Sequence, residues 1–177
     1  MESWTDHMKF LRSISLIIAL CFAVSAAPAV VLVVRHAEKE TAPADDPALT
    51  AVGKQRAVEL ARVVQAWSAG GAPVQALFAT EFKRTQQTLQ PLSAATGLTV
   101  STVRAKDTAA VVRAIMEVEG GIVVVAGHSN TVPEIIHALG GPAGIVIEDS
   151  DFDWLYALTR TGSAAGFVSL RYATRVP

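Results

Sequence analysis

The chain has 177 residues, of which 51% are hydrophobic and 18% are charged, enough apolar material for one globular domain with a sizeable core. Its 15 basic and 16 acidic residues give a formal net charge of -1, which excludes the broad cationic surface that nucleic-acid binding requires. Any basic patch must therefore be local, and we expect no nucleic-acid partner.

A signal for export is predicted at the N-terminus. Lys9 and Arg12 precede an apolar run at 14–24, and small residues follow as far as Ala26 and Ala27. This order is typical of a secretory signal peptide that is cleaved near one of the two alanines. The sequence therefore predicts a periplasmic or secreted protein.

Two alternatives stay open for this region. Glu2 suits a positively charged signal start badly, which makes Met8 an alternative first residue, and an uncleaved signal would anchor the chain. With cleavage we expect no stable membrane association, and the chain divides into an N-terminal extension and signal, 1–27, and one folded domain, 28–177. Because Cys21 is the only cysteine, that domain has no thiol for a disulfide, for catalysis or for a metal.

The domain is predicted to begin with a buried strand that leads into an arginine and a histidine. Residues 30–34 are apolar and mostly β-branched, without the polar alternation of a half-exposed strand. Arg35 and His36 come next. The strand therefore brings a fixed cation and a titratable imidazole to the carboxyl edge of the sheet, where open α/β folds bind ligands.

Strands and helices alternate along the rest of the chain. A loop rich in Pro and Asp at 40–49 leads to Thr50, which can cap the next helix. The alternation predicts an α/β fold, a three-layer sandwich with a largely parallel sheet and helices on both faces. We expect helices at 51–68, 80–96, 108–118 and 131–139, strands at 74–79, 98–103 and 122–126, and a final hairpin or edge pair at 154–158 and 166–172.

Four side chains from distant segments are expected to meet at one edge of this sheet. Arg35 and His36 leave the first strand, Arg84 follows the second, and His128 directly follows the fourth. Right-handed crossovers bring the carboxyl ends of parallel strands to the same edge. His137, inside a predicted helix, is interpreted as a structural or surface residue.

This set of residue types points to phosphoryl transfer. A phosphoryl group in transfer spreads negative charge over its oxygens, and guanidinium groups bind such oxygens in pairs. Nearby arginines also favour the neutral, nucleophilic form of an imidazole. We predict that His36 attacks phosphorus, that Arg35, Arg84 and His128 bind the phosphate oxygens, and that no metal or cofactor takes part.

Departure of the leaving group needs a proton, and the sequence offers two carboxylates for it. Glu38 lies two residues after the predicted nucleophile, and Asp107 lies at a strand-to-helix turn on the same edge. An ion pair of Glu38 with Lys39 or Arg84 is the ordinary alternative. The donor stays open between Glu38, Asp107 and neither.

Three other signatures are incomplete. The stretch Gly127 to Thr131 imitates the nucleophile elbow of serine hydrolases, but Thr131 replaces the last glycine and no downstream histidine can act as base for Ser129. His36-Ala37-Glu38 resembles the H-x-E of zinc deaminases without their cysteine pair. Ala48 stands where a P-loop needs glycine.

The same residues resemble the histidine phosphatase superfamily, also called phosphoglycerate mutase-like, and specifically a small exported bacterial member of it. The resemblance covers about residues 29–172. It rests on four motifs in order: Arg35-His36-Ala37-Glu38, Leu49 to Gln55, Ala79 to Thr88, and Ala126-Gly127-His128-Ser129.

The resemblance implies that His36 is the phosphorylated nucleophile and that Arg35, Arg84 and His128 complete the phosphate pocket, within the same three-layer fold. Ala37 departs from the family's usual glycine, and the insertion that carries an acid in mutases is missing after Arg84. We therefore expect an exported, metal-independent phosphatase that hydrolyses a small phosphomonoester through a phosphohistidine. The alternative is a non-catalytic module of the same fold that binds phosphate or a phosphosugar.

Overall fold

The computed structural model describes residues 27–161 and 164–173. The predicted signal peptide, apart from Ala27, lies outside the described residues. Within the described part of the chain, no helix combines the length and the apolar character that crossing a membrane requires.

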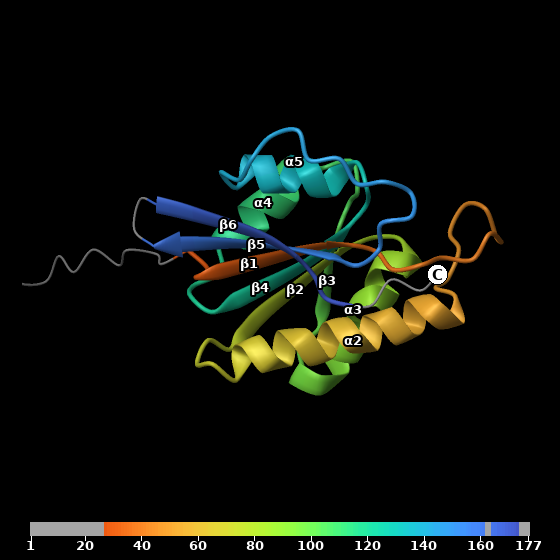
Figure 1. Ribbon diagram of the computed structural model, residues 1–177, viewed down its shortest axis with the longest axis horizontal. Coiled ribbons are helices and arrows are strands. Elements are labelled where there is room, and N and C mark those ends of the chain that lie inside the picture. The colour runs from red at the N-terminus through yellow and green to blue at the C-terminus, as the bar shows by residue number, and fades with distance from the viewer. Residues whose placement is uncertain (1–26, 162–163, 174–177) are drawn as a thin grey trace, which may run out of the picture.

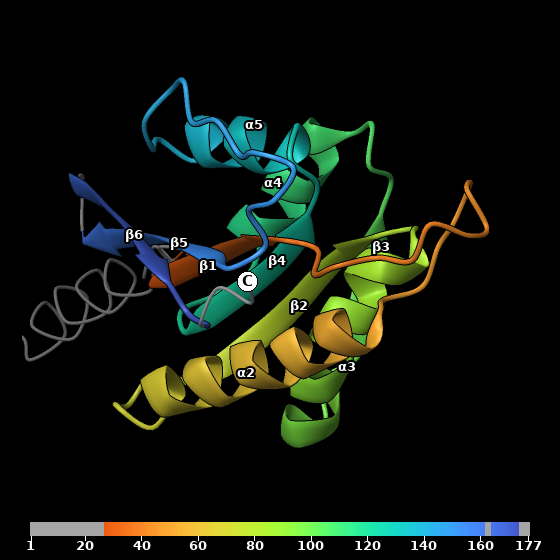
Figure 2. The same cartoon turned by 45° about the vertical axis from the view of Figure 1, so that its right-hand side comes forward.

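A six-stranded sheet lies between two pairs of helices (Figures 1 and 2). The strand order is β3-β2-β4-β1-β5-β6, with three parallel pairings among the first four strands and antiparallel pairings for the last two. The three-layer α/β prediction is therefore confirmed, with a mixed sheet. The elements are β1 (Val30–Arg35), α2 (Ala51–Ser68), β2 (Val74–Thr80), α3 (Lys83–Thr96), β3 (Val100–Val103), α4 (Thr108–Met116), β4 (Ile122–Gly127), α5 (Thr131–Ala138), β5 (Trp154–Thr161) and β6 (Ala164–Arg171).

The central strands are apolar throughout because both of their faces are covered. In β1, Leu32 and Val34 pack on the side of α2 and α3, whereas Val31 and Val33 pack on the side of α4 and α5. Successive side chains of a strand point to opposite faces, so a strand between two helix layers needs apolar residues at every position. The two cores hold the ends of β1 and β4 in place at the carboxyl edge.

Several predicted boundaries shift in the structure. The second strand continues through Thr80, and α3 begins at Lys83 because Phe82 before it has an extended backbone. Gly97 ends α3 with a φ of 74°, and the following strand begins two residues later than predicted, at Val100. The final pair is a hairpin with strands of eight residues each.

The antiparallel direction of β5 brings a loop to the carboxyl edge. Leu155, at the start of β5, pairs with Val34, at the end of β1. The loop that precedes β5 therefore reaches the place where Arg35 and His36 leave β1. Pattern alone did not predict this approach.

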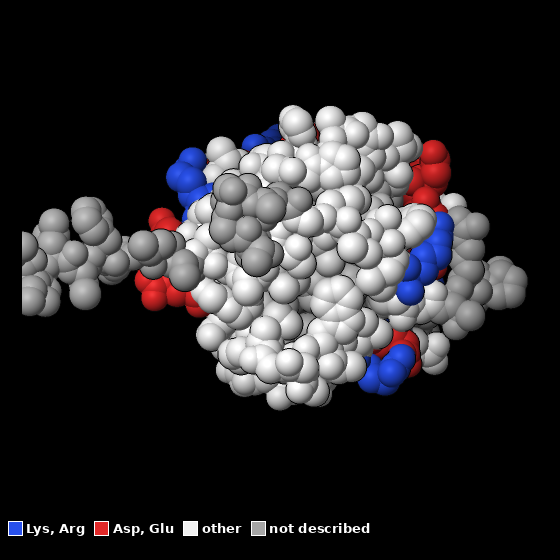
Figure 3. Space-filling model, turned by 60° about the vertical axis from the view of Figure 1, so that its left-hand side comes forward, with Lys and Arg blue, Asp and Glu red and all other residues white. Residues whose placement is uncertain are grey.

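Charged side chains are distributed unevenly over the surface. The side toward the tip of the β5–β6 hairpin, on the left of Figure 1, is largely uncharged, and its few charged side chains lie near the rim of the view (Figure 3). On β6, Val168 is 56% exposed. The charged residues considered next lie at the opposite ends of the strands, at the carboxyl edge.

Candidate active site

A pocket of about 600 Å³ lies at the carboxyl edge of the sheet. It is lined by all four of the side chains expected there, Arg35, His36, Arg84 and His128. Further charged and aromatic side chains on its wall are Lys39, Glu81, Phe82, Lys106 and Glu134. The imidazole rings of His36 and His128 are 5.4 Å apart between centroids.

His36 is held in one tautomer by its own backbone. Its Nδ1 donates to the carbonyl of Ala37 at 2.7 Å, because a carbonyl can only accept. Nε2 is then the unprotonated nitrogen with a free electron pair. Burial lowers the pKa of His36 to about 3, since the charged form loses its water, and the nearby positive groups act in the same direction. The ring is therefore a neutral, nucleophilic imidazole at neutral pH.

The segment that carries His36 is tied to two helices. Ala37 N–H donates to Thr88 Oγ1 at 3.0 Å, and that hydroxyl donates to the carbonyl of Arg84 at 2.7 Å. On the other side, Gly53 in the first turn of α2 packs against the backbone of Glu38, where any side chain would collide with the carbonyl. The glycine therefore lets α2 approach the loop after β1 closely.

Arg35 is held by the loop before β5. One guanidinium nitrogen, NH1, lies within hydrogen-bond distance of the carbonyls of Glu148, Asp149 and Asp151, at 2.7, 3.2 and 3.3 Å. The guanidinium also lies over the ring of Phe152, 4.4 Å from its centroid. Its Nε is buried and has no hydrogen-bond partner among residues 27–161 and 164–173.

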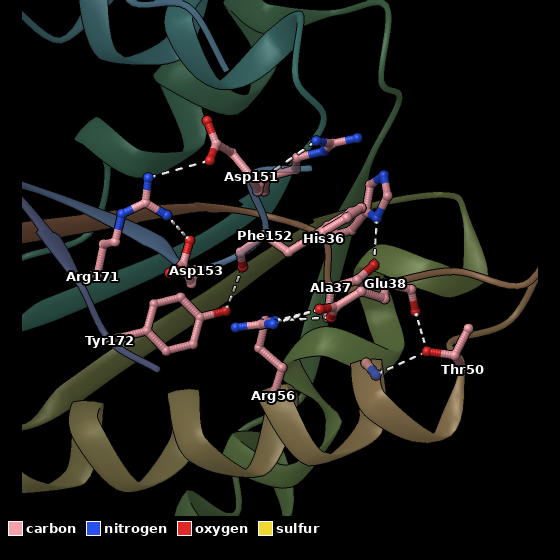
Figure 4. A network of polar contacts seen from close by, with 12 residues as sticks. His36, Ala37, Glu38, Thr50, Arg56, Asp151, Phe152, Asp153, Arg171 and Tyr172 are labelled. Atoms are coloured by element: carbon pink, nitrogen blue, oxygen red, sulfur yellow. Dashed lines mark hydrogen bonds and ion pairs between the residues drawn. The ribbon is translucent and has the colours of Figure 1, made fainter. Parts of the chain in front are cut away.

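The loop is itself anchored to the end of β6. Arg171 pairs with the carboxylates of Asp151 and Asp153, and the hydroxyl of Tyr172 donates to the carbonyl of Phe152 at 3.1 Å (Figure 4). Because these contacts hold the loop from the opposite side, the carbonyls that bind Arg35 have a rigid base.

Arg84 is held differently, by an aromatic ring. Its guanidinium lies over the ring of Phe82, 4.3 Å from the centroid, and its Nε is buried and unpaired within the part of the chain that the structure describes. A cation over an aromatic face is attracted by the ring's electrons but keeps its N–H donors for another acceptor.

His128 ends a chain of threonine hydroxyls. Its Nε2 lies 3.0 Å from Thr80 Oγ1, which lies 2.8 Å from Thr85 Oγ1. Thr85 donates to backbone carbonyls, so Thr80 must donate to Thr85 and His128 must donate to Thr80. His128 therefore carries its proton on Nε2. Burial, together with the charge of Arg84, lowers its pKa to about 4.

Glu38 does not lie at the pocket, which corrects its prediction as a proton donor there. Its carboxylate is directed toward α2 and pairs with Arg56, with both oxygens within 2.9 Å of Nε (Figure 4). The predicted ion-pair partners, Lys39 and Arg84, are therefore wrong. The reason is tertiary, because Arg56 is 6% exposed and its buried charge needs a carboxylate.

Asp107 serves as a helix cap instead. Its carboxylate accepts the N–H of Ala110 at 2.8 Å at the start of α4, and it is not among the residues that line the pocket. His137 is exposed on α5, consistent with a surface role. Sequence reasoning missed Glu81, although the segment that carries Arg84 had already been assigned to this edge.

Among residues 27–161 and 164–173, no group of three or more His, Cys, Asp or Glu side chains is arranged to hold an ion.

Comparison with solved structures shows a shared fold. A protein described as phosphohistidine phosphatase SixA from Agrobacterium tumefaciens is 21% identical with a TM-score of 0.56, covering 81% of this chain and 97% of its own. SixA complexed with tungstate is 17% identical with a TM-score of 0.62, covering 80% and 96%. Phosphoserine phosphatase from Entamoeba histolytica, in complex with 3-phosphoglyceric acid, is 12% identical with a TM-score of 0.59, covering 82% and 98%.

The family itself is shown by the sequence model. The model of the histidine phosphatase superfamily (branch 1) matches residues 31–119, half of the chain, from β1 through α4. No curated protein matches. The matched range includes Arg35, His36 and Arg84. The chain belongs to the histidine phosphatase superfamily (branch 1) and is an enzyme of the phosphatase class.

Proposed function

We propose that this protein hydrolyses a small phosphomonoester in two steps through a phosphohistidine on His36. One observation carries the proposal: the guanidinium-bearing side chains of Arg35 and Arg84 line the same pocket as His36, whose ring is neutral there. Guanidinium groups bind the oxygens of a phosphoryl group in pairs. An oxyanion in this pocket therefore lies near two fixed positive charges.

Binding of the phosphate uses the donors already present. Arg35 and Arg84 offer guanidinium N–H groups, and the arriving phosphate competes with Thr80 for the Nε2–H of His128. These donors are positioned before the substrate arrives and lie in a partly buried pocket, where they stabilise developing negative charge more strongly than in water.

The chemical steps follow from the tautomer of His36. Its Nε2 electron pair forms the N–P bond while the bond from phosphorus to the leaving oxygen breaks. Water then attacks phosphorus, the N–P bond breaks, and phosphate leaves with the imidazole restored. The covalent intermediate divides one difficult displacement into two easier ones.

The similar proteins agree with a small phosphorylated substrate. One is a SixA complexed with tungstate, an oxyanion, and another is a phosphoserine phosphatase complexed with 3-phosphoglyceric acid. The pocket volume of about 600 Å³ leaves room for an organic group beside the phosphate. We propose a phosphatase rather than a mutase, since Arg84 is not followed by the inserted acid of mutases.

We also propose that the protein is exported. The support is the sequence of residues 1–27, in which basic residues, an apolar run and small residues follow one another. Fractionation of cells that express the full chain tests this proposal. A mature protein that begins near residue 27 in the periplasm or medium is expected, and a full-length cytosolic protein contradicts export.

Trapping of the phosphoenzyme tests the function. The purified protein is mixed with radiolabelled p-nitrophenyl phosphate and quenched, and the labelled residue is identified after proteolysis. We expect acid-labile label on His36, no label in His36→Ala, and retained label in the matched control His137→Ala, whose histidine is exposed on α5. Phosphate binding without any label in the wild type indicates the non-catalytic binding module instead.

A further inference from the structure

The proposed hydrolysis needs a proton for the leaving oxygen, and Glu38 and Asp107 lie elsewhere. Two carboxylates line the pocket in the described part of the chain, those of Glu81 and Glu134. Given the proposed function, one of these two carboxyl groups supplies the proton for the leaving oxygen.

Glu81 lies between two residues that contact His128. The residue before it, Thr80, accepts a hydrogen bond from His128 Nε2–H. The ring of the residue after it, Phe82, meets the His128 ring edge-on at a centroid distance of 5.4 Å. The charge of Glu81 partly opposes the lowering of the pKa of both His128 and Arg84, as a carboxylate close to both groups does. The Glu81 side chain therefore lies on the part of the pocket wall that Arg84 and His128 form.

The Glu81 carboxylate is held at one oxygen and free at the other. Oε2 accepts the N–H of Ala105 at 2.7 Å, from the loop between β3 and α4. Oε1 has no hydrogen-bond partner within residues 27–161 and 164–173. A carboxyl group anchored in this way has one oriented oxygen available for proton transfer.

Glu134 fits the role less well. It projects from α5, and its Oε2 accepts the hydroxyl of Thr108, the first residue of α4. Its charge is not among those that shift the pKa of His36, His128 or Arg84. It therefore ties two helices together beside the pocket and serves as a matched control.

We propose that Glu81 is the catalytic acid and base of the hydrolysis. When His36 attacks phosphorus, the breaking P–O bond leaves its electron pair on the departing oxygen, which takes the proton from Glu81 Oε1. The resulting carboxylate then takes a proton from the water that attacks the phosphohistidine. Glu81 is protonated again at the end, and the net reaction adds one water to the phosphomonoester.

Leaving groups of different stability distinguish this role from a structural one. p-Nitrophenolate departs readily as an anion, phenolate less readily, and benzyl alkoxide needs a proton. Glu81→Gln cannot donate a carboxylic proton, yet its amide oxygen can still accept the N–H of Ala105, which keeps the loop anchored. The measured quantity is kcat/KM, since it covers every step through release of the alcohol.

We expect Glu81→Gln to lower kcat/KM for benzyl phosphate about 10²–10³-fold, for phenyl phosphate less, and for p-nitrophenyl phosphate by no more than about threefold. Formate is expected to restore part of the benzyl phosphate activity of Glu81→Ala. Glu134→Gln is expected to change all three substrates by the same small factor.

The outcomes separate the possible failures. An equal loss for all three substrates in Glu81→Gln shows that Glu81 does not protonate the leaving group and overturns the proposal, as does no loss at all. A loss that depends on the leaving group in Glu134→Gln moves the role to Glu134. Absence of His36-dependent label in the wild type overturns the proposed function itself.

Discussion

The two halves of the pocket contain the same residue types but hold them by different means. In the β1 half, backbone carbonyls bind Arg35 and the Nδ1–H of His36, and Phe152 contacts both side chains. In the other half, side chains hold Arg84 and His128, namely the ring of Phe82 and the hydroxyl of Thr80.

The half with Arg35 and His36, the first half, is therefore rigid, and the half with Arg84 and His128, the second half, is adjustable. Backbone carbonyls in a loop anchored by Arg171 have little freedom, so His36 and Arg35 are in place before a ligand binds. Among the described residues, Arg84 Nε donates to no partner, and the guanidinium lies over the ring of Phe82 without the carbonyl contacts that hold Arg35. We infer that the second half adapts to the phosphate after the first half has oriented it.

The largest loss of activity is expected from replacing either pocket histidine, His36 or His128, with glutamine. His36→Gln removes the nucleophile and should lower kcat/KM for p-nitrophenyl phosphate at least about 10⁴-fold. His128→Gln keeps an N–H donor and should lower it about 10²-fold. A phosphoenzyme that persists in His36→Gln and is lost in His128→Gln reverses the assignment of the two halves.

Lysine variants of the two arginines are expected to lose similar activity but to differ in the free energy of unfolding. Arg35→Lys and Arg84→Lys each replace a planar fork by a point charge and should lower kcat/KM about 10²–10³-fold. Because backbone carbonyls lose their donor, Arg35→Lys should also lower the free energy of unfolding by about 1–3 kcal/mol. Denaturant titration measures this loss, and equal stability of the two variants contradicts the rigid-half interpretation.

Acid should destabilise the protein through both histidines. Their folded pKa values, about 3 for His36 and about 4 for His128, lie below the ordinary value of 6.5. Between the folded and the ordinary pKa of each histidine, the unfolded chain binds more protons than the folded chain. The free energy of unfolding therefore falls as the pH is lowered below about 6.5. Each histidine contributes a slope of up to about 1.4 kcal/mol per pH unit.

A variant without one of these imidazoles isolates this contribution. In His36→Gln the free energy of unfolding between pH 6.5 and pH 4.5 should fall less steeply than in the wild type. Chemical denaturation at a series of pH values gives both slopes. If the free energy of unfolding falls equally steeply with decreasing pH in both proteins, the buried imidazole of His36 does not contribute to the acid sensitivity.

The smallest effect is expected from the hydroxyl chain in the second half. Thr85→Val leaves the Thr80 hydroxyl without its acceptor, so its proton can turn toward His128 Nε2 and oppose that tautomer. We expect kcat/KM to fall about tenfold, the equivalent of one hydrogen bond of about 1.4 kcal/mol. Thr85→Ser should restore it, and the ¹⁵N chemical shifts of the His128 ring report the tautomer directly.

The first half offers a matched comparison for this variant. Thr88→Val removes the link between Ala37 N–H and the Arg84 carbonyl but leaves the His128 chain intact. It should lower stability without changing the tautomer of His128. An altered His128 spectrum in Thr88→Val means that the two halves are coupled through α3.

The sequence alone determined the elements and the edge on which the site lies. An uninterrupted apolar strand has to be covered on both faces, and parallel strands joined by helices end at a common edge, so the positions of Arg35, His36, Arg84 and His128 along the chain placed them together. Local pattern was sufficient because each of these residues directly follows or lies close to the end of a predicted strand.

Only the tertiary structure decided which partners these side chains take. Glu38 is near His36 in sequence, but the buried guanidinium of Arg56, eighteen residues away, binds its carboxylate. Phe152 and the carbonyls that bind Arg35 lie more than 110 residues from it and arrive because β5 runs antiparallel to β1. Such contacts depend on strand order and direction, which a local sequence pattern does not encode.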